Sequence, residues 1–84
     1  MKLVELLKKA PQSVKDKYNI EVRKLAIENV KKKIIKLQKT LDDFSDDEME
    51  VMINEAANAI DEKAKVTLLT TLLIAAGVKL AFFT

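Results

Sequence analysis

Apolar residues near the start of the chain have the spacing of one helical face. They follow the i, i+3, i+4, i+7 pattern at Leu3, Leu6, Leu7 and Ala10. This pattern predicts a short amphipathic helix over residues 2–10. Pro11 ends that helix, because proline disfavours the helical conformation of the residue before it. Ser13 and Asp16 resemble a weak N-terminal cap, so we expect the next helix to begin near Ser13.

The most regular pattern belongs to the second predicted helix, over residues 13–42. Its apolar positions are separated by three, four or seven residues, at Ile20, Ile27, Val30, Ile34, Leu37 and Leu41, with Phe44 beyond them. An apolar stripe of this kind packs against another helix. Further apolar residues widen the stripe, namely Val22, Leu25, Ala26 and Ile35. We therefore expect this helix to have two neighbours and a lysine-rich outer face.

A capping box marks the start of the third predicted helix, over residues 46–62. Ser45 is followed three residues later by Glu48, so each side chain is expected to bond the other residue's backbone amide. Phe44 before the cap and Met49 in the first turn form the expected hydrophobic staple. Three acids at the helix start complement the positive end of its dipole. The sequence therefore predicts that this helix begins at Asp46.

The amphipathic pattern disappears from Val66 to Thr84, where thirteen of nineteen residues are apolar. A helix that is apolar on nearly all sides is either central in a bundle or spans a membrane. As a helix of about 1.5 Å per residue, this segment would measure about 27 Å, close to the bilayer core of about 30 Å. Its four threonines and Lys79 instead favour burial in a bundle, with each hydroxyl bonded to a carbonyl one turn earlier.

These patterns together predict an all-α fold in a single domain over residues 1–84. We expect a small bundle of three or four helices, in which amphipathic helices pack around an apolar C-terminal helix over residues 65–82. The break between the last two helices, near residues 61–65, is inferred only from the change in pattern. One long bent helix is the alternative there. With one glycine and one proline in 84 residues, a fold rich in tight turns is excluded.

The net charge of +2 conceals a strong separation of charge along the chain. Residues 1–39 carry twelve basic and four acidic side chains, a net charge of +8. Residues 40–84 carry three basic and nine acidic side chains, a net charge of −6. We expect the acidic stretch to fold back on the basic helix and partly neutralise it.

The composition excludes most catalytic and metal chemistry. Because the chain has no histidine and no cysteine, it lacks the usual zinc ligands, a thiol nucleophile and a histidine base. Its acidic cluster comprises Asp42, Asp43, Asp46, Asp47 and Glu48. These acids lack the glycine and the final glutamate of a calcium loop, and helix capping explains them better. We therefore expect no enzymatic activity, no cofactor and no metal.

Two sets of residues are candidates for binding. The first would form a protein interface and comprises Met49, Met52, Leu69, Leu73, Leu80, Phe82 and Phe83. Methionines on a helical face bind varied partner helices, and adjacent aromatics at a helix end point to different sides. The second set would contact phosphates and comprises Arg23, Lys24, Lys31, Lys32, Lys36 and Lys39. The sequence lacks clustered aromatics for base stacking, which favours a solvated lysine face.

The function expected from the sequence is that of a non-enzymatic helical interaction protein in the cytoplasm. It would form a homo-oligomer or bind a protein partner, because a domain of this size buries too little surface to be more than marginally stable alone. Small accessory proteins, including viral ones, have this character. One alternative is a membrane-associated protein held by Val66 to Phe83. The other is a nucleic-acid-binding module that uses the basic face of the second helix.

Overall fold

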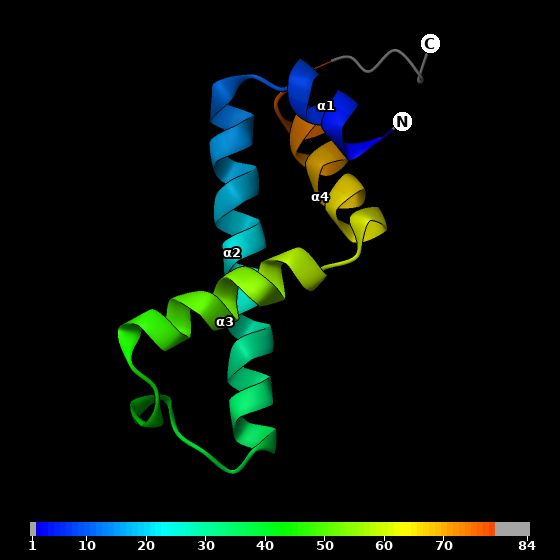
Figure 1. Ribbon diagram of the computed structural model, residues 1–84. Helices are drawn as coiled ribbons and strands as arrows, with labels where there is room; N and C mark the ends of the chain where they lie inside the picture. The colour runs from blue at the N-terminus through cyan, green and yellow to red at the C-terminus, as the bar shows by residue number, and fades with distance from the viewer. Residues whose placement is uncertain (1, 79–84) are drawn as a thin grey trace. The chain divides into compact units, whose positions relative to one another are not determined.

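The computed structural model describes residues 2–78 and is helical throughout its regular parts (Figure 1). The α-helices are α1 (Leu3–Lys9), α2 (Gln12–Lys36), α3 (Asp46–Ala59) and α4 (Glu62–Ala75). A 3-10 turn, η1 (Leu41–Asp43), lies between α2 and α3. Residues 2–78 contain no strand, so the predicted all-α class with a small number of packed helices is confirmed.

Two compact units make up the chain, and each has its own core. The first unit comprises residues 2–20 and 61–78 of the described chain, and the second comprises Glu21–Ile60. Helix α2 contributes its first turns to the first unit and its remaining length to the second. The expectation of a single domain stays a prediction.

In the first unit, α1 packs against the apolar helix α4 (Figure 1). Leu6 of α1 and both Leu69 and Leu73 of α4 are fully buried. Ala10, Val14 and Tyr18 complete this core. Partial burial of Tyr18 raises the pKa of its hydroxyl above the usual range, because the charged phenolate loses hydration.

Helix α4 has one buried stripe, although its sequence is apolar on nearly all sides. Leu69 and Leu73 are buried, whereas Thr67, Thr71 and Ile74 are exposed. The Thr67 hydroxyl donates to the Lys63 carbonyl at 3.0 Å, and the Thr71 hydroxyl donates to the Thr67 carbonyl at 2.9 Å. Bonds of this kind were predicted for every threonine of the segment, and Thr67 and Thr71 have them, which satisfies their hydroxyls without a partner outside the helix.

In the second unit, α3 packs across the part of α2 that belongs to this unit (Figure 1). The buried core consists of Ala26, Val30 and Ile34 from α2 and Ile53 from α3. Around it pack the half-buried side chains of Ile27, Phe44, Met49, Met52, Ala56 and Ala57. Ala56 and Ala57 of α3 are small enough for the two helices to approach closely.

The predicted stripe of α2 is wrong at several positions. The side chains of Ile20, Leu37 and Leu41 are exposed, and the buried residues of this unit instead recur every four positions, at Ala26, Val30 and Ile34. A seven-residue stripe requires a neighbour that follows the helix along its length. A neighbour that crosses the helix contacts a short row of residues four apart, and this row is what α3 covers.

The end of α2 also differs from the prediction, because the helix stops at Lys36 and not near residue 42. Gln38 has a positive φ of 59°, in the left-handed region. The Lys39 amide donates to the Ile34 carbonyl and the Gln38 amide donates to the Ile35 carbonyl, which together form a Schellman motif. Glycine is the usual residue at that left-handed position, so glutamine gave no signal of a helix end.

The same motif ends α4 at Ala75, seven residues before the predicted end. Gly77 has a φ of 78°, and the amides of Gly77 and Val78 donate to the carbonyls of Ile74 and Leu73. Gly77 is the usual residue at this position and could have marked the helix end in the sequence, but the apolar residues on both sides of it suggested a longer helix.

The helix starts agree better with the sequence. Helix α3 begins at Asp46, as predicted from the capping box. Helix α2 begins at Gln12, so Ser13 lies inside the helix and does not cap it. Asp61 caps α4 by accepting from the Lys63 amide at 3.3 Å, and α3 and α4 are therefore two helices with a break at Ile60 and Asp61.

Candidate protein interface

Met49 and Met52, which the sequence assigns to a protein interface, are both half-buried on α3. Both pack against the core of the second unit. Met52 also lines two open grooves. A flexible thioether at such a position adapts to different neighbours. Both methionines therefore pack against the core, and Met52 also lines the two grooves.

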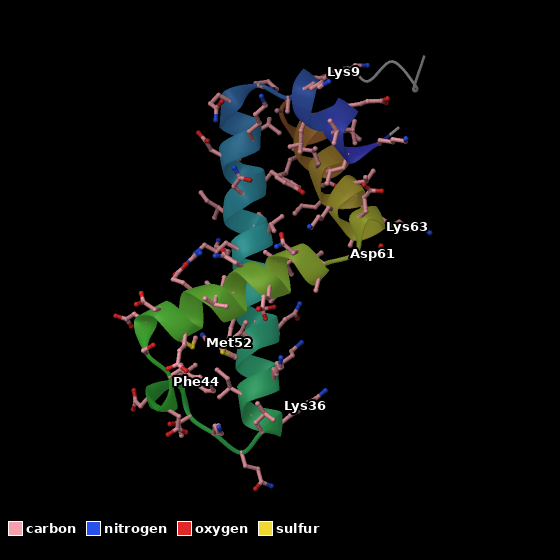
Figure 2. The ribbon with its side chains drawn as sticks, viewed as in Figure 1. Lys9, Lys36, Phe44, Met52, Asp61 and Lys63 are labelled. Carbon is pink, nitrogen blue, oxygen red and sulfur yellow. The ribbon has the colours of Figure 1, made fainter. Side chains whose placement is uncertain are left out.

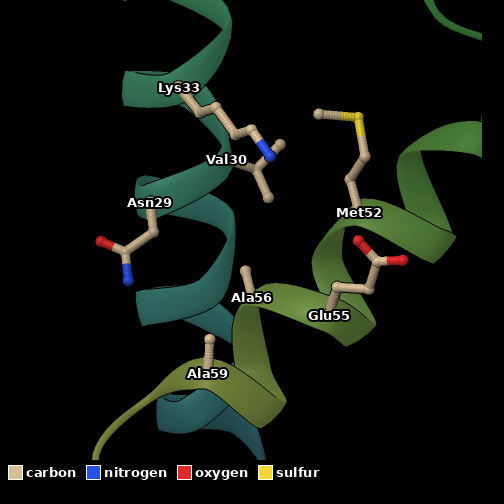
Figure 3. Close-up of a pocket in the computed structure, with 7 residues that line it drawn as sticks. All are labelled: Asn29, Val30, Lys33, Met52, Glu55, Ala56 and Ala59. Atoms are coloured by element: carbon tan, nitrogen blue, oxygen red, sulfur yellow. The ribbon is translucent and has the colours of Figure 1, made fainter.

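The first groove lies between α2 and α3 and has a volume of about 360 Å³. Figure 3 shows Val30 and Lys33 projecting from α2, with Met52 and Glu55 opposite them on α3. The other lining residues are Asn29, Ala56 and Ala59. Small alanines leave this space open, and the groove carries one positive and one negative side chain at its edge.

The second groove lies at the start of α3, also with a volume of about 360 Å³, and is more open. Phe44, Val51 and Met52 supply its apolar surface, and Figure 2 labels Phe44 and Met52 among them. Asp47 and Glu48 supply its acidic edge. An apolar floor beside acidic side chains is typical of a groove that receives an apolar side chain flanked by basic ones.

The capping box fixes the geometry of this second groove. The Glu48 amide donates to the Ser45 hydroxyl at 3.1 Å, and the Ser45 amide donates to the Glu48 carboxylate at 3.0 Å. These bonds to Ser45 hold the pKa of Glu48 below its usual range, because they stabilise the charged carboxylate. The Lys39 amino group lies 5.7 Å from the centre of the Phe44 ring and adds a cation–π contact.

An ion pair joins α2 to α3 elsewhere in this unit. The Arg23 guanidinium donates two hydrogen bonds to the Glu50 carboxylate. Its side chain holds the pKa of Glu50 below the usual range and has its own pKa raised in return. Both side chains are about half exposed, so the pair orients the helices and adds little stability.

Unlike the methionines, the predicted interface residues of the C-terminal segment that the structure describes are fully buried. Leu69 and Leu73 are fully buried in the first unit, so they form its core and are not available to a partner. That part of the predicted interface is corrected, because a helix packed on α1 uses its most regular apolar row for its own core. The predicted positions Leu80, Phe82 and Phe83 lie outside the described residues.

The six predicted phosphate contacts do not form one free basic surface. Arg23 pairs with Glu50, and the Lys24 amino group lies 3.5 Å from the Glu21 carboxylate. Lys39 is occupied with the Phe44 ring. Lys31, Lys32 and Lys36 are exposed, and in residues 2–78 no acid forms an ion pair with them. Figure 2 shows Lys36 pointing away from α2.

The two most exposed large apolar residues of the second unit were not among the predicted interface residues. Ile35 of α2 has 72% of its surface exposed and Val51 of α3 has 56% exposed. Ile35 was assigned to the widened stripe of α2, which the crossing geometry of α3 does not reach. Val51 has one acidic residue a turn before it and another a turn after it. A single apolar residue on a polar helix face was therefore the sequence signal for an exposed position.

Within residues 2–78 no helix has both the length and the apolar character that a membrane span requires. No group of three or more potential metal ligands occurs in the same residues. Comparison of the chain with protein-family models, with curated proteins and with solved structures found no match.

Proposed function

We propose that the protein is a non-enzymatic helical interaction protein that associates with itself. The observation that carries this proposal is the exposure of large apolar side chains on the second unit. These residues are Leu25, Ile35, Leu37, Leu41 and Val51. The first unit exposes Val4, Ile20 and Ile74. Apolar surface that remains in water favours association, at about 25 cal/mol for each Å² that a partner covers.

The small core of the second unit supports the same proposal. Only four residues are buried there, and one of them is an alanine. A unit of 40 residues buries too little apolar surface to be strongly stable alone. Covering its exposed apolar residues would add the burial that its own two helices do not supply. The groove beside Met52 provides a recess for such a contact.

Sedimentation velocity of the full chain over a range of concentrations tests the proposal. We expect the mean mass to rise above 9.5 kDa as the concentration increases. Val51→Ser should weaken the association, because it removes apolar surface at the groove. Val4→Ser is the matched control, since Val4 is equally exposed, at 60%, but lies in the first unit. A mass of 9.5 kDa at every concentration would contradict the proposal.

One observation favours nucleic-acid binding as a second candidate function. Lys31, Lys32 and Lys36 are exposed on α2 and have no ion-pair partner in the described chain. Phosphate contacts of this kind weaken steeply as salt increases. Retardation of a duplex or single strand in a low-salt gel shift, lost in the Lys31→Glu/Lys32→Glu variant, would support this function. Absence of retardation at low salt would exclude it.

A further inference from the structure

We infer that self-association pairs the surface around Ile35 of one copy with the surface around Val51 of a second copy. This inference rests on the proposed function and adds the identity of the partner and of the two contacting surfaces. Both surfaces lie in the second unit, so each can be described within that unit alone. Each surface has an exposed apolar side chain at its centre and charged side chains around it.

The first surface, called the lysine surface, consists of Ile35 with Lys31 and Lys32. The two lysines precede Ile35 by four and three residues, so the three side chains lie on one face of α2. All three are exposed. Neighbouring Ile34 is buried in the core, which shows that this face is turned away from the contact between α2 and α3. An isoleucine with 72% of its surface in water is therefore bordered by positive charge.

The second surface, called the acid surface, consists of Val51 with Asp47 and Glu55. The acids stand four residues before and four residues after the valine, on the same face of α3. All three side chains are exposed. The groove lined by Phe44, Val51 and Met52 opens next to this face and has room for an aliphatic side chain. The acid surface thus combines an apolar recess with negative charge.

The two surfaces are complementary in apolar character and opposite in charge. Each exposes an apolar residue that its own unit does not cover, and the charges around them attract across an interface. The lysine surface of one copy therefore finds its complement on another copy of the same chain. In a two-fold dimer every copy contributes both surfaces, so the contact forms twice and closes. Apolar contact supplies affinity, and the charges fix which surfaces meet.

Charge reversal of each surface tests the pairing by sedimentation velocity. In Lys31→Glu/Lys32→Glu both surfaces become acidic, and in Asp47→Lys/Glu55→Lys both become basic. We expect the dissociation constant of each variant alone to be at least about tenfold higher than that of the unmodified chain, because like charges then face each other. An equimolar mixture should restore association as a heterodimer, since every contact then joins opposite charges. Added salt should weaken the unmodified dimer.

Variants that fold poorly are recognised by circular dichroism and thermal unfolding, measured on each before mixing. Because Asp47 lies in the first turn of α3, Glu55→Lys alone serves as a second acid-surface variant that leaves the helix start intact. Restoration by the mixture supports the pairing. Variants that associate as tightly as the unmodified chain, or a mixture that remains monomeric, overturn the pairing but leave the proposed function standing. An unmodified chain that is monomeric throughout overturns both.

Discussion

The two units of the chain reach stability by different means. The first unit buries three leucines completely, one from α1 and two from α4. The second unit buries four residues against six in the described part of the first. Polar contacts supplement this smaller core, namely the Ser45 capping box at the start of α3 and the half-exposed Arg23–Glu50 ion pair between its two helices. The second unit also exposes more large apolar residues than the described part of the first unit. Apolar pattern alone therefore does not say which segment is core and which is surface.

That difference has a functional consequence. The described part of the first unit exposes three large apolar residues, whereas the second exposes five, Ile35 and Val51 among them, and so has more apolar surface to share with a partner. The segment that looks most suited to binding in the sequence, α4, uses its leucines internally. The segment that looks like an ordinary charged helix, α3, has the exposed apolar residue and the groove. The following predictions test this contrast.

The largest effect is expected in the core of the first unit. Leu73→Ala should lower the free energy of unfolding by about 2–5 kcal/mol, because it removes a fully buried side chain and leaves a cavity. Ile74→Ala, one position away on the exposed face, is the matched control and should change it by less than about 0.5 kcal/mol. Urea unfolding followed by circular dichroism measures both. Similar losses for the two variants would show that α4 is not packed on one side.

The capping box of the second unit should give the next largest effect. Ser45→Ala removes the acceptor of the Glu48 amide and should cost about 1 kcal/mol. Ser13→Ala is the control within α2, where the serine lies inside the helix and alanine is a better helix former. Hydrogen exchange should show lower protection of the α3 amides in Ser45→Ala. Equal protection in both variants would contradict a capping role for Ser45.

The left-handed residue at the end of α2 offers a stabilising change. Gln38 has a φ of 59°, a conformation that costs a residue with a side chain about 1–2 kcal/mol relative to the right-handed one. Glycine adopts it freely, so Gln38→Gly should raise the free energy of unfolding by about 0.5–1 kcal/mol. Glu28→Gly, at an exposed position in the interior of α2, should lower it by about 1 kcal/mol. If Gln38→Gly also destabilises, the helix does not end where the structure places it.

These positions also show what the sequence could predict and why. The start of α3 was predictable because Ser45 and Glu48 are three residues apart and their bonds are local. The end of α2 was not, because Gln38 carries no preference for the left-handed conformation that it adopts.

The exposure of Ile35 could not be predicted from the sequence, for a different reason. Which part of a wide apolar stripe is buried depends on where a second helix crosses it, and that crossing is a non-local property. The same holds for Leu69 and Leu73, whose burial depends on α1, far away in sequence. The sequence therefore predicted only part of the candidate site: it identified the methionines of α3 but not the exposed residues Ile35 and Val51.

The smallest effect should be a pH dependence that belongs to the second unit. Bonds to Ser45 and to Arg23 lower the pKa values of Glu48 and Glu50 in the folded chain. Between the ordinary glutamate pKa, about 4.3, and the lower folded values, the unfolded chain binds more protons than the folded one. Their stabilisation is therefore complete above about pH 4.3 and is lost as the pH falls through the folded values. Because both carboxylates are exposed, the loss should be modest and reduced by salt.

Glu48→Gln separates this titration from the capping contact. Glutamine still accepts from the Ser45 amide, as it does in other capping boxes, but it has no proton to gain. Between about pH 5 and about pH 3 the urea midpoint of this variant should fall less steeply than that of the unmodified chain. Hydrogen exchange should place the difference in α3 and leave α4 unchanged, because Glu48 lies in α3 of the second unit and α4 belongs to the first. An unaltered slope in Glu48→Gln would mean that the capping carboxylate does not govern the acid sensitivity of the second unit.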